Sequence, residues 1–194
     1  WFAKIILMLM RLSVWRSQAT FCQNTDDREL LVGNSSSRRA KIFFFPGPGV
    51  NINRFKYRKI KPSNVLEVLC VGRLIWQKGI RDLYALLKEF HNSEQLNGVN
   101  FRLLGEIDYS HPDRVPLEKI KEMESMGLTW LPWTDKIENE YWDSDILLFM
   151  SEREGGPRAV LEASSCGRLT VGADVVGVNQ MIINNTTGYL VQTG

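Results

Sequence analysis

The chain has 194 residues, enough for one domain of about 150 residues and part of another, or for two small domains. Hydrophobic residues make up 44% and charged residues 24%, ordinary proportions that exclude low-complexity, collagen-like and wholly disordered chains. The net charge of +2 is too small to indicate a nucleic-acid partner. Three cysteines and two histidines lack metal-ligand spacing, so we expect no disulfide framework, no zinc site and a reducing compartment.

An apolar segment opens the chain at Trp1–Trp15, interrupted by Lys4 and Arg11. Its uncharged run, Ile5–Met10, is much shorter than the about 20 residues that a membrane-spanning helix needs. We expect a helix buried in a domain or docked on one, and a helix lying on a membrane interface is the alternative. Because the chain begins inside this helix, we expect it to be truncated.

Polar residues follow at 23–40, where a Gly-Asn pair and a run of serines indicate a loop. A strand is expected at Lys41–Phe45, and Pro46–Gly49 then breaks the pattern as a hinge or linker would. Basic residues cluster between Arg54 and Lys61. We interpret this cluster as a solvated connector, and a site for an acidic partner is the alternative.

From residue 64 onward, short apolar runs alternate with stretches of helical periodicity. The expected strands are 65–71, 101–104, 128–131, 145–150, 169–171 and 189–191, and the expected helices are 80–90, 117–126, 137–142 and 157–166. This alternation predicts βαβ units and therefore an α/β, Rossmann-like parallel sheet flanked by helices. Ligands of such sheets bind outside the carboxyl ends of the strands, so the loops there are the candidate sites.

The first such loop runs from Gly72 to Gly79, between the strand at 65–71 and the helix at 80–90. Gly72 permits a tight turn, and Arg73 and Lys78 place two cations before a helix N-terminus. Helix N-termini attract phosphate, and Arg and Lys strengthen that attraction. The sequence thus indicates a phosphate-binding loop, with surface cations beside an ordinary turn as the alternative.

The second loop, Ser151–Pro157, leads into a helix that contains Glu162. Gly155 and Gly156 leave backbone N–H groups open to a ligand, and Pro157 suits the first position of a helix. Glu154 and Glu162 would suit a site that accepts hydrogen bonds from sugar and ribose hydroxyls. Taken singly, Glu154 is expected to be a solvated loop carboxylate and Glu162 an exposed helix residue.

Together these motifs resemble the C-terminal half of retaining glycosyltransferases of GT-B fold, family four. The resemblance lies in GRLIWQKG, DILLFMSEREGGPRAVLEASSCGR and VGVNQMIINNTTGYLV, and it extends from about residue 20 to the end of the chain. The hallmark is a pair of glutamates in an E-G-x-P-x-x-x-x-E setting, matched by Glu154 and Glu162. The segment GEIDYSHPDRVP is also similar to bacterial members that build capsule, O-antigen and other surface polysaccharides.

The resemblance implies a role for each matching residue. Arg73 and Lys78 would hold the donor diphosphate beside Gly72 and offset the charge of the leaving nucleotide, and Glu154 would contact donor-sugar hydroxyls; these three side chains are the expected catalytic residues. Glu162 would bind the ribose, the segment Gly155, Gly156 and Pro157 would meet sugar or phosphate through its backbone, and Trp133 is a weaker candidate for the wall of the nucleobase site. This is positional and electrostatic catalysis with retention, without metal or cofactor.

Some positions depart from the family pattern: Asn51, Pro132, Leu169 and Gln180 stand where Asp, Gly, Pro and Glu are common. The change at Gln180 puts any role of that loop in doubt. The resemblance further implies three parts, namely a remnant of the N-terminal acceptor domain and junction at 1–45, a linker at 46–63 and a nucleotide-sugar-binding domain at 64–194. The fold would then be truncated at both ends.

The expected function is transfer of a sugar, with retention, from a nucleotide-diphosphate sugar to a saccharide or lipid-linked saccharide acceptor. UDP-hexose and UDP-N-acetylhexosamine are the favoured donors, and surface polysaccharide biosynthesis is the favoured context. We expect a cytoplasmic location at the inner face of the plasma membrane, peripheral contact through the N-terminal domain, no nucleic-acid partner, and no activity of this fragment alone. The alternatives are a non-catalytic or inactive sugar-nucleotide-binding fragment and a sugar-nucleotide epimerase of GT-B fold.

Overall fold

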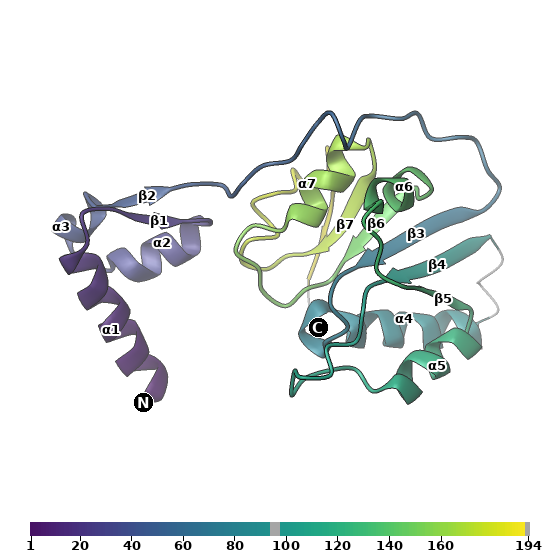
Figure 1. Ribbon diagram of the computed structural model, residues 1–194, viewed down its shortest axis with the longest axis horizontal. Coiled ribbons are helices and arrows are strands. Elements are labelled where there is room, and N and C mark those ends of the chain that lie inside the picture. The colour runs from purple at the N-terminus through teal and green to yellow at the C-terminus, as the bar shows by residue number, and fades with distance from the viewer. Residues whose placement is uncertain (94–97, 193–194) are drawn as a thin grey trace.

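The computed structural model describes residues 1–93 and 98–192 (Figure 1). A small N-terminal unit and a larger α/β unit are joined by a long segment without helix or strand, which crosses the top of the α/β unit in the view of Figure 1. The division at residues 45 and 63 into acceptor-domain remnant, linker and donor domain stays a prediction.

The N-terminal unit packs three helices around a two-stranded parallel sheet. Its elements are α1 (Phe2–Arg16), β1 (Thr20–Cys22), α2 (Thr25–Val32), α3 (Ser36–Arg39) and β2 (Ile42–Phe44). A small core of Val14, Cys22, Leu31, Val32 and Ile42 holds them together. Most of α1 is exposed, and Val14 anchors it in this core. In the described part of the chain, no helix has the length and apolar character required to traverse a bilayer.

The α/β unit contains a six-stranded, wholly parallel sheet in the order β5-β4-β3-β6-β7-β8. The strands are β3 (Leu66–Val71), β4 (Val99–Leu104), β5 (Leu128–Leu131), β6 (Ile146–Phe149), β7 (Leu169–Ala173) and β8 (Gly188–Val191). The helices are η1 (Trp76–Lys78), α4 (Ile80–Asn92), α5 (Leu117–Ser125), α6 (Ile137–Trp142) and α7 (Arg158–Ser165). The predicted α/β class, a parallel sheet flanked by helices, is confirmed.

Two apolar cores lie on the two sides of this sheet, because the central strands are apolar on both faces (Figure 1). Helices α4 and α5 cover one face, where Leu83, Leu87 and Ile120 are almost fully buried. Helices α6 and α7 cover the other face, where Tyr141 and Val160 are fully buried. Burial at this level stabilises by about 1.5–3 kcal/mol for each large apolar side chain.

The connecting segment is anchored to the α/β unit. Phe55 is 2% exposed and packs against Tyr141 with ring centroids 6.0 Å apart. The carbonyl of Phe55 accepts a hydrogen bond from Ser165 Oγ at 2.6 Å, and the carbonyl of Lys56 accepts one from Trp142 Nε1 at 2.8 Å. The expectation of a solvated connector at Arg54–Lys61 is therefore wrong for Phe55, which belongs to the core.

The structure also corrects the N-terminal half of the sequence interpretation. Residues 23–40 were expected to form a loop, but they hold α2 and α3. The polar residues that indicate a loop are the caps of these helices: Asn24 accepts a hydrogen bond from the backbone of Asp27, and Ser35 accepts one from Arg38. Strand β1 was missed because three residues carry too little periodicity to be recognised.

Candidate donor-binding site

The strand order reverses between β3 and β6, since the chain proceeds outward from β3 through β4 to β5 and returns to place β6 on the other side of β3. Ligands of open α/β sheets bind at such a switch point, outside the carboxyl ends of the strands. The loop at 72–79 follows β3 and the loop at 150–157 follows β6. The two loops selected from the sequence therefore meet at the expected position of a ligand.

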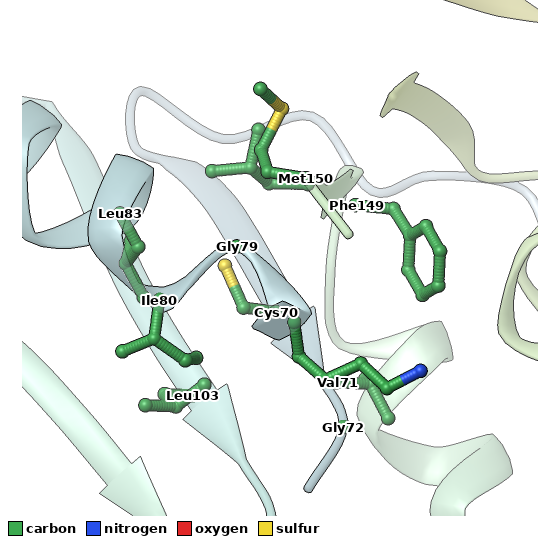
Figure 2. Close-up of a pocket in the computed structure, with 11 residues that line it drawn as sticks. Cys70, Val71, Gly72, Gly79, Ile80, Leu83, Leu103, Phe149 and Met150 are labelled. Atoms are coloured by element: carbon green, nitrogen blue, oxygen red, sulfur yellow. The ribbon is translucent and has the colours of Figure 1, made fainter. Parts of the chain in front are cut away.

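Backbone contacts fix the two loops to each other. The carbonyl of Gln77 accepts hydrogen bonds from the backbone N–H of Glu152 at 3.0 Å and from Ser151 Oγ at 3.3 Å. Gly79 has φ +79°, and a Cβ atom there would lie 2.4 Å from the carbonyl oxygen of Met150. Figure 2 shows Gly79 and Met150 together beside the small pocket at the end of β3. A glycine is required for this close approach.

Lys78 and Glu154 form an ion pair across the two loops, with Nζ and Oε1 2.5 Å apart. Both side chains are mostly buried, 24% exposed for Lys78 and 16% for Glu154, so the expectation of a solvated loop carboxylate is wrong for Glu154. The backbone N–H of Glu154 donates to the carbonyl of Val176 at 3.1 Å. Gly177 lies against this segment, because a Cβ atom there would be 2.1 Å from the carbonyl oxygen of Glu154.

An open pocket of about 580 Å³ adjoins this ion pair. Among its lining residues are five of those selected from the sequence: Gly72, Arg73, Lys78, Glu154 and Pro157. The side chain of Arg73 is 60% exposed, and its guanidinium lies 3.5 Å from Asp108. With Arg158, which also lines it, the pocket combines three cations, one carboxylate and a glycine turn, a set that suits a ligand with both phosphate and hydroxyl groups.

Glu162 lies outside the residues that line this pocket and is 8% exposed, which corrects the expectation of an exposed helix position. Its carboxylate accepts a hydrogen bond from Tyr141 Oη at 3.1 Å and one from Arg158 at 3.3 Å. Burial raises the pKa of Glu162 above its ordinary 4.5, although Tyr141 and Arg158 act in the opposite direction. Burial also raises the pKa of Tyr141 well above 10.

The glycine pair after Glu154 faces the N-terminal unit. The carbonyl of Gly155 accepts a hydrogen bond from Asn24 Nδ2 at 3.2 Å, and a Cβ atom on Gly155 would lie 2.6 Å from Gln23 Oε1. A Cβ atom on Gly156 would lie 3.2 Å from the terminal methyl of Met181. Asp27 forms an ion pair with Arg153 in the same loop. The structure therefore places the start of α2 against this candidate donor loop.

Two further residues change the composition of the site. Trp133 follows β5, is 64% exposed and does not line the pocket, so the structure does not bring it to the other candidates. Arg158, which the sequence interpretation missed, lines the pocket and pairs with Glu162 one helical turn away. Its spacing of four residues from Glu162 was the available signal.

The two cysteines of the α/β unit are apolar core residues. Burial raises the pKa of Cys70 to about 12 and that of Cys166 to about 11, so both thiols stay protonated at neutral pH. Cys70 lines the small pocket together with Gly79 and Ile80 (Figure 2). Neither cysteine has the surroundings of a nucleophile.

Comparison with known proteins identifies the family and the fold. The family model described as glycosyl transferases group 1 matches residues 66–194, which include the whole of the described sheet, and the chain belongs to this family. The resemblance to family-four glycosyltransferases of GT-B fold is confirmed.

Among named relatives, a Campylobacter jejuni protein is 31% identical over 174 residues, covering 82% of this chain and 43% of its own length. Its name is N,N'-diacetylbacillosaminyl-diphospho-undecaprenol alpha-1,3-N-acetylgalactosaminyltransferase. One component of the Arabidopsis thaliana phosphatidylinositol N-acetylglucosaminyltransferase is 28% identical over 167 residues, covering 83% of this chain and 36% of that protein. The chain thus spans less than half the length of either relative.

Solved structures share the fold. Anabaena HepE in complex with UDP aligns with a TM-score of 0.74 at 18% identity, covering 92% of this chain and 50% of HepE. Sucrose-phosphate synthase from Thermosynechococcus elongatus aligns with a TM-score of 0.77 at 20% identity, covering 97% of this chain and 49% of that chain. These alignments place both units of the chain within one known architecture.

Proposed function

We propose that this chain carries the donor-binding half of a retaining glycosyltransferase that uses a UDP-hexose or a UDP-N-acetylhexosamine. The observation that carries the proposal is the Lys78–Glu154 ion pair beside Gly72, at the switch point of the sheet. In this proposal residues 64–194 bind the donor, residues 46–63 form the linker and residues 1–45 belong to the acceptor-binding domain.

The charge distribution supports a nucleoside diphosphate as ligand. An ammonium group has three N–H donors, so Lys78 keeps two after its hydrogen bond to Glu154. Arg73 adds an exposed guanidinium that fits a phosphate in bidentate fashion, and Arg158 adds another. Anabaena HepE, which shares the fold, has been solved with UDP and with UDP-glucose.

The proposed mechanism is one of position and charge. Arg73 and Lys78 hold the diphosphate and stabilise the negative charge that grows on it as the glycosidic bond breaks. Glu154 orients the donor sugar through its hydroxyls. Glu162 accepts from the ribose with Oε1, which also accepts from Arg158, while its Oε2 accepts from Tyr141. The donor's own phosphate assists attack of the acceptor on the same face, which retains the anomeric configuration. The proposed reaction uses no metal and no cofactor.

The acceptor proposed is a saccharide or lipid-linked saccharide in surface polysaccharide synthesis. Support comes from the names of relatives: the Campylobacter protein acts on a diphospho-undecaprenol substrate, and an Escherichia coli relative at 25% identity is a putative colanic acid biosynthesis glycosyltransferase. We further propose that the full protein works at the cytoplasmic face of the membrane. Apolar side chains exposed on α1, among them Phe2, Met8 and Trp15, are the candidates for peripheral contact.

A thermal-shift panel with UDP, GDP, ADP and CMP tests the proposal. A ligand at 100 times its Kd stabilises the folded state by about 2.7 kcal/mol, so UDP should raise Tm by several degrees and the other nucleotides should not. A selective shift with GDP would support a donor site at this position, with a guanine nucleotide as the donor instead of a uridine nucleotide. A cooperative melt that no nucleotide shifts would overturn the proposal in favour of a non-catalytic module. Product analysis in the absence of an acceptor distinguishes a glycosyltransferase from an epimerase, because an epimerase converts its sugar nucleotide without an acceptor.

A further inference from the structure

A second pocket, of about 390 Å³, lies at the other end of the sheet. Its lining comes from the connecting segment, from the starts of β3 and β7, and from residues 142–145 at the end of α6 and before β6. Arg102 of β4 also lines it. These are the amino ends of the parallel strands, whereas the candidate donor site lies outside their carboxyl ends. The pocket is therefore separate from the donor site and takes no part in the proposed function.

Arg168 is the buried charge of this pocket. Arg168 is 3% exposed, and its guanidinium donates hydrogen bonds to three backbone carbonyls: those of Tyr141 at 3.0 Å, Arg58 at 3.0 Å and Trp142 at 3.3 Å. Its Nη1 atom is enclosed and has no hydrogen-bond partner among the described residues. A buried guanidinium without an anion is costly, because neutral carbonyls replace only part of its hydration.

Three more cations, all from the connecting segment, line the same pocket as Arg168: Arg58, Lys59 and Lys61. Within residues 1–93 and 98–192, no carboxylate lies at ion-pair distance from any of these four side chains. Arg102, the fifth cation, is already neutralised by Glu67 and Glu140. Of the described carboxylates in the lining, Glu67 is thus in use, so Asp143 and Asp145 remain against four cations. Asp145 also accepts a hydrogen bond from the backbone of Glu67 at 2.9 Å, which orients it but leaves its charge in place.

The local backbone holds the cations in place. The connecting segment is fixed by hydrogen bonds to the carbonyls of Phe55, Lys56 and Arg58, and the Arg58 guanidinium stacks on the ring of Trp142 at 3.3 Å from its centroid. This leaves Lys59 and Lys61 exposed at the mouth, where their ammonium groups can reach a ligand. Several cations line one pocket, and its volume exceeds that of a single ion. A doubly charged oxyanion matches this arrangement better than a single carboxylate does.

We propose that this pocket binds a phosphate group, with Lys59, Lys61 and Arg58 in direct contact and Arg168 supplying charge from beneath. The group is carried either by a soluble phosphate ester or by a lipid headgroup, and the recognition chemistry is the same in both cases.

Calorimetric titration with inorganic phosphate and pyrophosphate tests the proposal, in an Arg73→Gln/Lys78→Gln/Arg158→Gln background that removes the three cations of the donor site. Lys59→Gln/Lys61→Gln should weaken binding at least about tenfold, since two charge-assisted contacts are lost. Lys88→Gln/Lys121→Gln is the matched control, because it removes two exposed lysines elsewhere and leaves the same net charge. All four lysines are exposed, so the variants should fold.

A parallel arm uses phosphatidylcholine vesicles with and without phosphatidic acid. Vesicle binding that needs phosphatidic acid, Lys59 and Lys61 assigns the phosphate to a lipid headgroup, and binding of soluble phosphate alone assigns it to a soluble ester. Equal losses in the pocket variant and in the control variant, or no binding of either probe, would overturn the proposal.

Discussion

Glu154 and Glu162 belong to one sequence motif, yet their surroundings differ. Glu154 is paired with a cation that faces a pocket, whereas Glu162 is buried and bonded to Tyr141, whose side chain is fully enclosed. Removing the carboxylate of Glu162 would leave the Tyr141 hydroxyl without a partner, at a cost of about 1–3 kcal/mol. Glutamine is therefore the better probe at position 162, because it keeps an acceptor.

Glu162→Gln should change how stability depends on pH. The folded pKa of Glu162 is raised, so the folded state binds the proton more tightly than the unfolded state does. The stabilisation that comes from this tighter proton binding is fully present below the ordinary pKa of 4.5 and is lost as pH rises through the folded pKa. The free energy of unfolding of the wild type, relative to Glu162→Gln, should therefore fall as pH rises across that window.

Urea unfolding at a series of pH values measures this difference. Glu124→Gln, at an exposed position of α5, serves as the control for replacing a carboxylate by an amide. A difference that is flat or increases with pH would contradict the raised pKa of Glu162.

Lys78→Gln should weaken UDP binding by about 2 kcal/mol, roughly thirtyfold, because a charge-assisted contact to the diphosphate is lost. Binding of uridine, which has no phosphate, should change little. Lys88→Gln, an exposed lysine of α4, is the control. Isothermal titration with both ligands measures the effect, and equal losses for UDP and uridine would refute contact between Lys78 and the diphosphate.

Among the elements, the junction of α4 with the end of β6 depends on Gly79. Gly79→Ala should destabilise the fold by about 2–4 kcal/mol, since it adds a strained positive φ to an overlap with the backbone of Met150. Gly49→Ala is a matched control: its φ is +71°, but nothing lies within 4 Å of the added methyl. It should cost only the backbone strain, about 1–2 kcal/mol. Chemical unfolding of both variants gives the comparison, and equal losses would mean that the α4–β6 junction is not tightly packed.

The elements of the α/β unit follow closely from the sequence, because each strand is a short apolar run and each long helix has an apolar stripe. The predicted helices at 80–90 and 117–126 correspond to α4 (Ile80–Asn92) and α5 (Leu117–Ser125). Helices α2 and α3 could not be recognised in this way, since they are short, polar and stabilised by capping and by packing on α1.

The part of the candidate site that lies at the carboxyl ends of strands could be predicted from the sequence. Gly72, Lys78 and Glu154 follow neighbouring strands, so the topology alone brings them together. Burial of Glu162 depends on Tyr141 of α6, and the position of Trp133 depends on the path of the chain after β5; both are tertiary facts that no local pattern encodes. The roles assigned to these residues stay predictions.

At the scale of the molecule, Gln180 links the two units. Its amide accepts from the backbone N–H of Thr25 at 3.1 Å and donates to Thr25 Oγ1 and to Asp26 Oδ2, both at 2.8 Å. From the family resemblance, we expect glutamate at this position in many relatives. Here it would place a second carboxylate against Asp26 and lose both donated bonds, which explains why an amide suits this chain.

Gln180→Glu should therefore weaken the contact between the units by about 1 kcal/mol, and adding Asp26→Asn should restore it by reversing the donor and the acceptor. Hydrogen exchange of the α2 backbone amides measures the contact. Protection should fall in the single variant and return in the double variant. If the double variant is no better than the single one, the Gln180–Asp26 hydrogen bond does not hold the units together.

The anchored connector has a mechanical consequence. Val50 and Phe55 pack against the α/β core, and before Pro46 the chain is tied into β2, so residues 46–49 are the part of the connector between these two anchors. Two of these four, Gly47 and Gly49, have φ values of +92° and +71° and no side chain to obstruct rotation. A rotation of the N-terminal unit relative to the α/β unit would therefore be confined to these four residues. Such a rotation would break the contacts at Gly155 and at Gln180 together, because both are made by the start of α2 and the residue before it.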